Sequence, residues 1–94
     1  MPYAIVRLSV ADFEQWKTVF TEAGALRKSF GSRGVTAYRS LEQPNDVVIL
    51  GDYADLARAR QLFQSDEFRA ATQRAGVTAP PQVTFADEVL KLPA

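Results

Sequence analysis

YAIVRLSV, residues 3–10, decides the fold because it is apolar on both sides of an extended chain. Successive side chains of a strand point to opposite faces of a sheet, so Ala4 and Val6 share one face while Ile5 lies on the other. A strand with two apolar faces is typical of the middle of a sheet, where both faces are covered. Residues 47–50, VVIL, repeat this pattern and predict a second central strand.

A helix and two further strands follow residues 3–10. Asp12 is placed to cap a helix. From Phe13 onward apolar residues recur at three- and four-residue steps, so we expect one continuous helix that ends before Gly31. Residues 35–41 and 47–53 then predict an antiparallel hairpin that turns at Pro44-Asn45.

The last third of the chain predicts a broken helix and a fourth strand. The helix is expected after Asp55, interrupted at Ser65-Asp66 and closed by Gly76, and the strand is expected over residues 83–90. This order is βαββαβ, which predicts the ferredoxin-like α+β fold: an antiparallel four-stranded sheet in the order 4-1-3-2 with the helices on one face. Residues 1–94 are expected to form a single domain.

Two helices can cover only one face of such a sheet, so its other face needs a second layer. The simplest second layer is another copy of the chain, packed sheet against sheet about a twofold axis. Ile5, Arg7 and Phe85 are the candidates for this dimer interface, where Arg7 could pair with a carboxylate of either protomer (Asp52, Asp87 or Glu88) and fix the register. The alternative is a monomer with an apolar patch.

The composition excludes several classes of function. Lys plus Arg equal Asp plus Glu at eleven each, without a run of one sign, so nucleic-acid binding has no electrostatic support. The chain contains no Cys and no His, and its carboxylates are scattered, so we expect no metal site and no cofactor. No stretch reaches the roughly 18 apolar residues of a membrane span. We therefore expect no membrane association and a cytoplasmic location.

Six residues are candidates to line a ligand pocket between helices and sheet: Trp16, Phe20, Arg27, Tyr38, Tyr53 and Phe63. Trp16, one turn before Phe20, could stack on a planar ligand or simply pack in the core. Arg27 continues the same stripe, where it could hold a phenolate, enolate or carboxylate, or else extend outward to solvent.

The other candidates are less constrained by their positions. Tyr38 and Arg39 point to opposite faces of their strand, so only one of them can enter the pocket. Tyr53 ends its strand, where its phenol could donate or pass a proton. Phe63, next to the expected helix break, could belong to a movable lid or to an ordinary kinked helix.

Several segments resemble a known group of proteins. The runs VADFEQW (10–16), LRKSFG (26–31) and ARA (57–59), with Tyr38-Arg39 and the Pro44-Asn45 turn, are similar to the dimeric α+β barrel superfamily and, more narrowly, to the antibiotic biosynthesis monooxygenases. The resemblance implies a ferredoxin-like protomer, a dimer closed into a barrel and often a pocket between helices and sheet. Haem-degrading relatives use a histidine on the iron, so the absence of histidine argues against that branch.

Two functions fit these observations. The first is a small cofactor-independent enzyme, a monooxygenase, isomerase or cyclase, that acts on an aromatic polyketide-like or lactone compound with the substrate anion held by Arg27 near Trp16. The second is a non-catalytic dimer that binds a small aromatic or anionic molecule or acts as a scaffold. A transcription-factor effector domain is less favoured, because no helix-turn-helix segment accompanies it. The sequence does not name the substrate.

Overall fold

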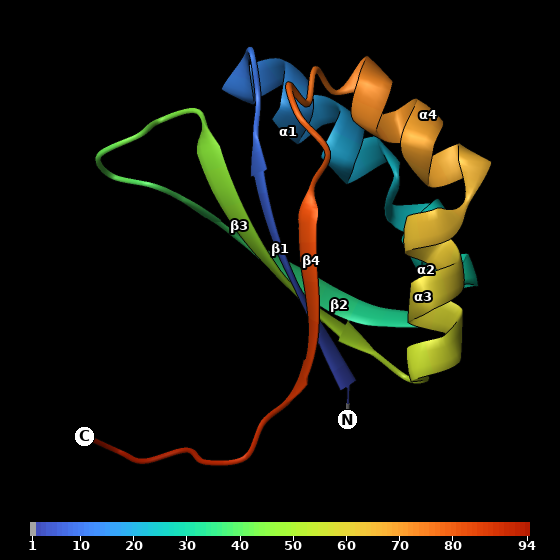
Figure 1. Ribbon diagram of the computed structural model, residues 1–94, viewed down its shortest axis with the longest axis vertical. Coiled ribbons are helices and arrows are strands. Elements are labelled where there is room, and N and C mark those ends of the chain that lie inside the picture. The colour runs from blue at the N-terminus through green and yellow to red at the C-terminus, as the bar shows by residue number, and fades with distance from the viewer. Residues whose placement is uncertain (1) are drawn as a thin grey trace.

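The computed structural model describes residues 2–94 and shows an antiparallel sheet with helices packed on one face (Figure 1). In chain order the elements are β1 (Pro2–Ser9), α1 (Phe13–Glu22), α2 (Gly24–Ser29), β2 (Ser32–Arg39), β3 (Asp46–Tyr53), α3 (Leu56–Gln64), α4 (Asp66–Arg74) and β4 (Gln82–Asp87). The sheet order is β2-β3-β1-β4, which confirms the predicted ferredoxin-like α+β topology with β1 and β3 in the centre.

The helix-covered face of the sheet forms the core, as the alternation in β1 predicts. Ala4 and Val6 of β1 are buried against the helices, and so are Val47 and Ile49 of β3. The remaining buried apolar residues are Val10, Trp16, Tyr53, Ala59, Leu62 and Ala75. The helices contribute to this core from the same side of the sheet (Figure 1).

No helix covers the opposite side of the sheet, which we call the open face (Figure 1). The strand registers place the following residues on it: Tyr3, Ile5 and Arg7; Gly34, Thr36 and Tyr38; Val48, Leu50 and Asp52; Gln82, Thr84 and Ala86. Ile5 and Arg7 thus lie on the predicted side. Phe85 does not, because it pairs with Ala4 on the helix-covered face and its ring lies 5.9 Å from that of Phe63. The assignment of Phe85 to the dimer interface is therefore corrected.

The first helical segment is two helices, whereas the sequence predicted one. Its start is as expected, because the Asp12 carboxylate accepts hydrogen bonds from the backbone N–H groups of Glu14 and Gln15. The helix then breaks at Ala23. Here the guanidinium of Arg27 donates to the carbonyl of Phe20 at 2.6 Å, and a side chain inserted into the helical hydrogen-bond ladder is a known cause of kinks.

The last strand, β4, ends at Asp87, whereas the sequence predicted that it would end at residue 90. Residues 88–94, here called the tail, form no helix or strand. Figure 1 shows the tail leaving β4 on the side away from the helices. Its apolar side chains are largely exposed: Val89 at 92%, Leu90 at 71% and Leu92 at 68%. The open face, with Ile5 and Leu50 at its centre, and the tail are thus two surfaces that no helix of the protomer covers.

Candidate ligand pocket

A cavity of about 70 Å³ lies between the helices and the sheet. All four helices line it, together with β1, β2 and β3. The lining is almost wholly apolar, and within the described residues 2–94 Arg27 is its only charged member. Typical ligand pockets measure about 300 Å³ or more. A ligand of one or more aromatic rings therefore requires the wall of this cavity to move outward.

One wall of the cavity belongs to a row of packed aromatic rings that we call the aromatic ladder. It consists of Phe13, Trp16 and Phe20 of α1, with ring centroids 5.6 Å and 4.8 Å apart. A guanidinium lies over each end, Arg39 at 4.1 Å from the centroid of Phe13 and Arg27 at 4.0 Å from that of Phe20. Each such cation–π contact contributes about 0.5–1 kcal/mol. The ladder therefore holds its arginines in place, and Trp16 and Phe20 face the cavity.

Arg27 is the cation of the cavity. It is half-buried and is held by the carbonyl of Phe20, to which it donates from Nη1. Burial lowers the pKa of Arg27, and the nearby phenol of Tyr53 acts in the opposite direction. A guanidinium stays protonated despite such a shift. Arg27 is thus a partly desolvated positive charge without a carboxylate beside it, which favours an anionic ligand group.

Tyr53 contributes a phenol to the cavity lining, and its position depends on Gly51. A Cβ at position 51 would lie only 2.7 Å from Cε2 of Tyr53, so the tyrosine ring lies over the space that the missing side chain leaves. The ring is 2% exposed and makes an edge contact with Phe63. Burial raises the pKa of Tyr53, while Arg27 tends to lower it. Tyr53 therefore stays protonated at neutral pH and can donate a proton or a hydrogen bond.

Aromatic side chains of α3 and α4 form the opposite wall. The Phe63 ring packs edge-on against Phe68 with 5.0 Å between the centroids, and both residues line the cavity. Phe63 also contacts Tyr53 and Phe85. Phe63 and Phe68 lie on opposite sides of the helix break, where α3 ends and α4 begins.

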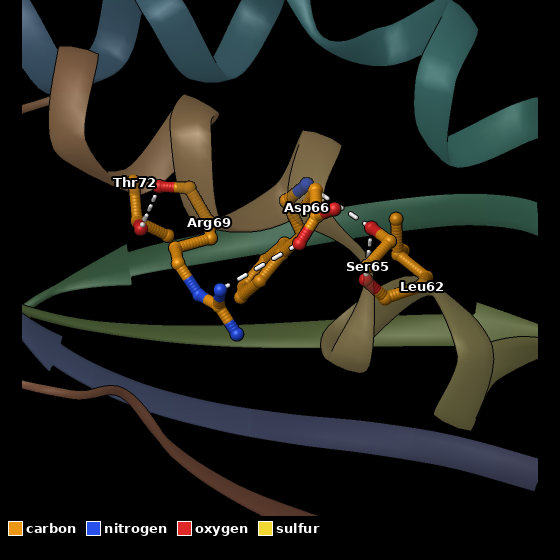
Figure 2. A network of polar contacts seen from close by, with 6 residues as sticks. Leu62, Ser65, Asp66, Arg69 and Thr72 are labelled. Carbon is orange, nitrogen blue, oxygen red and sulfur yellow. Dashed lines mark hydrogen bonds and ion pairs between the residues drawn. The ribbon is translucent and has the colours of Figure 1, made fainter.

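Ser65 organises the break between α3 and α4. Its hydroxyl donates to the carbonyl of Leu62 at 2.7 Å and accepts the backbone N–H of Phe68 at 3.1 Å (Figure 2). One side chain thus closes the end of α3 and caps the start of α4. The ion pair between Asp66 and Arg69, 3.6 Å long, is exposed on the outer surface of α4 and adds little. The break predicted from the sequence is a hydrogen-bonded turn directly behind the cavity wall.

The structure brings five of the six candidate residues together around the cavity: Trp16, Phe20, Arg27, Tyr53 and Phe63. Tyr38 lies on the open face and is 57% exposed, so its assignment to the pocket was wrong. Arg39, its neighbour, points to the helix-covered side instead and stacks on Phe13. Gly51 was not identified from the sequence, although a glycine inside a strand is a recognised sign of close approach by another group.

Within residues 2–94, His, Cys, Asp and Glu nowhere gather in threes in a way that could hold a metal ion. Over the same residues, none of the helices combines the length and the apolar character that a membrane crossing needs.

Comparison with known proteins identifies the fold of this chain but does not assign the chain to a family. No family model matches the sequence, and no curated protein does. A solved structure from Bordetella bronchiseptica, classed with the antibiotic biosynthesis monooxygenases, is 22% identical, with a TM-score of 0.81 over 95% of this chain and 97% of the other. SnoaB, a cofactor-independent oxygenase from Streptomyces nogalater, is 16% identical, with a TM-score of 0.79 over 99% and 97%.

A third solved structure carries a ligand. It is a Streptomyces coelicolor monooxygenase in complex with nanaomycin D, 19% identical, with a TM-score of 0.66 over 99% of this chain and 92% of the other. At these identities the likeness concerns architecture. The chain has the ferredoxin-like fold of the antibiotic biosynthesis monooxygenase-like proteins.

Proposed function

We propose that this protein is a cofactor-independent monooxygenase that acts on a small planar aromatic compound with an ionisable oxygen. The observation that carries the proposal is the combination in one apolar cavity of an aromatic wall, Trp16 and Phe20, with a single cation, Arg27. Rings stack on such a wall, and a phenolate or enolate oxygen is attracted to the partly desolvated guanidinium. Oxygenases with the same fold support the choice of reaction class.

The proposed reaction draws its electrons from the substrate. A phenolate or enolate is electron-rich and reduces O₂ itself, so a ring methylene becomes a carbonyl: one oxygen atom replaces its two hydrogens and the second leaves as water. Arg27 stabilises the substrate anion electrostatically. Tyr53, which burial keeps protonated, supplies a proton to the oxygen that is reduced and regains it from the substrate or from water.

Access to the cavity is part of the proposal. Since about 70 Å³ is too small for a fused-ring compound, the substrate enters when the wall at the α3–α4 break moves and Phe63 and Phe68 swing outward. The protein is proposed to work as a homodimer, because the open face and the tail stay uncovered in one protomer. Its cytoplasmic location stays a prediction from the sequence.

The test is oxygen consumption with hydroxylated naphthalenes, whose keto tautomers carry a ring methylene, and with related compounds that already carry one. Removal of one group that stabilises a developing oxyanion typically lowers kcat by about 10²–10³. We expect Arg27→Met to lower kcat/KM by about that factor and Tyr53→Phe to lower kcat with little change in KM. Arg69→Met, which removes an exposed guanidinium of α4, is the control and should have wild-type activity. Wild-type activity in Arg27→Met would remove the proposed role of Arg27.

The small size of the cavity favours one alternative, a non-catalytic dimer whose pocket is filled by its own side chains or binds a ligand without turnover. Thermal-shift measurements, combined with assays of oxygen uptake, distinguish the monooxygenase from the non-catalytic dimer. A compound that raises the melting midpoint without oxygen uptake or product indicates a binding protein. Turnover of the same compound, with incorporation of one labelled oxygen atom from ¹⁸O₂, indicates the monooxygenase.

A further inference from the structure

The helix that carries Arg27 is short and has no buried residue. α2 spans only Gly24–Ser29, and no side chain caps its start. Such a helix is not stable by itself, because isolated helices shorter than about 12–15 residues are marginal in water. The position of α2, and with it the position of Arg27, therefore depends on contacts with neighbouring elements.

The start of α2 is attached through Arg27 itself. The guanidinium donates to the carbonyl of Phe20 near the end of α1 and lies over the ring of the same residue. Leu26 adds a partly buried side chain that packs against the core. The Arg27 side chain starts from the backbone of α2, however, so its guanidinium reaches the cavity only where α2 places that backbone.

The end of α2 is attached to the start of α3 by two hydrogen bonds, which we call the α2 anchor. Arg58 of α3 donates from Nη2 to the carbonyl of Ser29, the last residue of α2. The backbone N–H of Ala54 donates to the carbonyl of Gly31 at 2.9 Å. The last carbonyls of a helix lack partners within it and carry partial negative charge, so a guanidinium is well suited to bind them.

Arg58 also lies against the turn that follows α2. A Cβ at Gly31 would lie 3.9 Å from Cβ, Cδ and Nη1 of Arg58, so the side chain passes close to Gly31 along its length. Gly31 has a φ of 88°, in the left-handed region that residues with a side chain rarely adopt. Arg58 thus contacts both the last carbonyl of α2 and the turn that directs the chain into β2.

The α2 anchor joins the two chain segments to which the proposed function assigns chemistry. Ala54 directly follows Tyr53, and Ser29 comes two residues after Arg27. Both Arg27 and Tyr53 line the cavity. Burial raises the pKa of Tyr53 and the charge of Arg27 lowers it, so the two groups are close enough to interact. The anchor therefore connects the segment of the anion-binding group with that of the proton donor.

We propose that Arg58 is a positioning residue of the monooxygenase, which holds α2 so that the Arg27 guanidinium keeps its place in the cavity beside Tyr53. Arg58 lies outside the residues that line the cavity and acts through the end of α2. Without its hydrogen bond, α2 swings about its junction with α1 at Ala23, and the guanidinium moves away from the substrate anion. This inference rests on the proposed function and adds to it a residue outside the cavity.

The first test needs no substrate, because the ring current of Phe20 marks the position of Arg27. The guanidinium lies 4.0 Å from the ring centroid, so the side-chain NMR signals of Arg27 are displaced by the ring. Arg58→Met keeps a long side chain but cannot donate, and we expect the displacement to collapse toward that of an unstacked arginine. Arg39, which stacks on Phe13 at the other end of the aromatic ladder, is the internal control and should keep its signals unchanged.

Two further variants separate the hydrogen bond from the mere presence of a charge on α3. Arg58→Lys keeps a cation that can donate to the Ser29 carbonyl, so the signals of Arg27 should return toward the wild-type values. Arg60→Met removes another guanidinium from the same helix, one that lies near the ring of Phe85, and should leave Arg27 unchanged. Displacement of Arg27 in Arg60→Met as well would show a general effect on α3 and overturn the role of Arg58.

The second test is kinetic and uses a substrate that the wild-type protein oxidises. Arg58→Met should lower kcat/KM by about tenfold or more, because a misplacement of about 1 Å by a remote mutation can cost ~10²-fold. In an Arg27→Met background the same substitution should have almost no further effect, since the group that it positions is absent. A merely structural role would lower the activity in both backgrounds by the same factor, and that result would overturn the proposal.

The NMR and kinetic results fail independently of each other. An Arg58→Met protein that is folded by circular dichroism and has wild-type Arg27 signals overturns the proposal, whatever its activity. If Arg58→Met did not fold, Arg58→Gln, whose polar side chain is shorter, would give the same comparison. Displaced Arg27 signals in Arg58→Met, together with no oxygen uptake by the wild type, would overturn the proposed function but confirm that Arg58 sets the position of Arg27.

Discussion

At position 51, β3 has room for a hydrogen atom but not for a methyl group. A Cβ there would lie 2.7 Å from Cε2 of Tyr53, whose ring is buried and makes an edge contact with Phe63. We therefore expect Gly51→Ala to cost about 1–3 kcal/mol in the free energy of unfolding, measured by urea denaturation, and to displace the Tyr53 ring.

Two further variants give this prediction its controls. Gly24→Ala adds the same methyl group at the start of α2, where the nearest atom is Nη2 of Arg27 at 3.7 Å, so it should be neutral or slightly stabilising. In a Tyr53→Ala background the cost of Gly51→Ala should largely disappear, because the conflicting ring is gone. An equal cost in both backgrounds would show that the ring is not the cause.

Alkaline pH should reveal the buried phenol of Tyr53. Burial raises its pKa above the ordinary value of about 10, so the folded state keeps the proton when the unfolded state has begun to lose it. The stabilisation by this group is complete below pH ~10 and is lost as the pH rises through the folded-state pKa. Above pH ~10 the unfolding free energy of the wild type should thus fall more steeply than that of Tyr53→Phe. The difference reports on Tyr53 alone, because Tyr3 and Tyr38 are present in both proteins. Parallel curves would contradict the assignment.

At the scale of the elements, Ser65 joins two helices through one hydroxyl group. Ser65→Ala removes both of its hydrogen bonds and should lower the unfolding free energy by about 1 kcal/mol or more. Ser65→Asp keeps an acceptor for the N–H of Phe68 but cannot donate to Leu62, so it should fall between wild type and Ser65→Ala. Amide exchange at Phe68 should be faster in Ser65→Ala, and an unchanged rate would mean that Ser65 does not hold the break closed.

The sequence predicts the elements that depend on patterns within one segment and misses those that depend on contacts between segments. The sheet order follows from the two-sided apolar strands, and the α3–α4 break follows from its polar cap. The break at Ala23 was missed because the apolar stripe runs on through Leu26, and the stripe does not show that the Arg27 side chain bonds to the Phe20 carbonyl at the break.

The candidate site shows the same division. Helical spacing predicts Trp16 and Phe20 on one face of α1 without any knowledge of the rest of the chain, whereas Arg27 reaches the same cavity from α2, beyond the break at Ala23. Alternation in a strand says that Tyr38 and Arg39 point oppositely, but the face that each takes depends on the register with β3. Phe85 was misplaced for the same reason, because its pairing with Ala4 joins two strands that lie far apart in the sequence.

For the whole molecule, we expect the tail to contribute to association rather than to the folding of the protomer. Burial of an apolar side chain is worth about 1.5–3 kcal/mol, and three such residues are exposed after β4. A chain that ends at Asp87 should therefore have a dimer dissociation constant at least about tenfold higher, as measured by sedimentation. Replacement of Val89, Leu90 and Leu92 by serine should have the same effect at unchanged length. If truncation and serine replacement both leave the constant unchanged, the tail does not pack on the partner.

The aromatic ladder also has an optical consequence. Trp16 is the only tryptophan in the chain, and at the edge of the cavity it lies between Phe13, whose ring is tilted against it, and Phe20, on which it stacks. The indole emission of the protein therefore comes from a single place beside the proposed ligand. An aromatic guest that stacks there should quench this emission, so occupancy can be followed by fluorescence in real time without any attached dye.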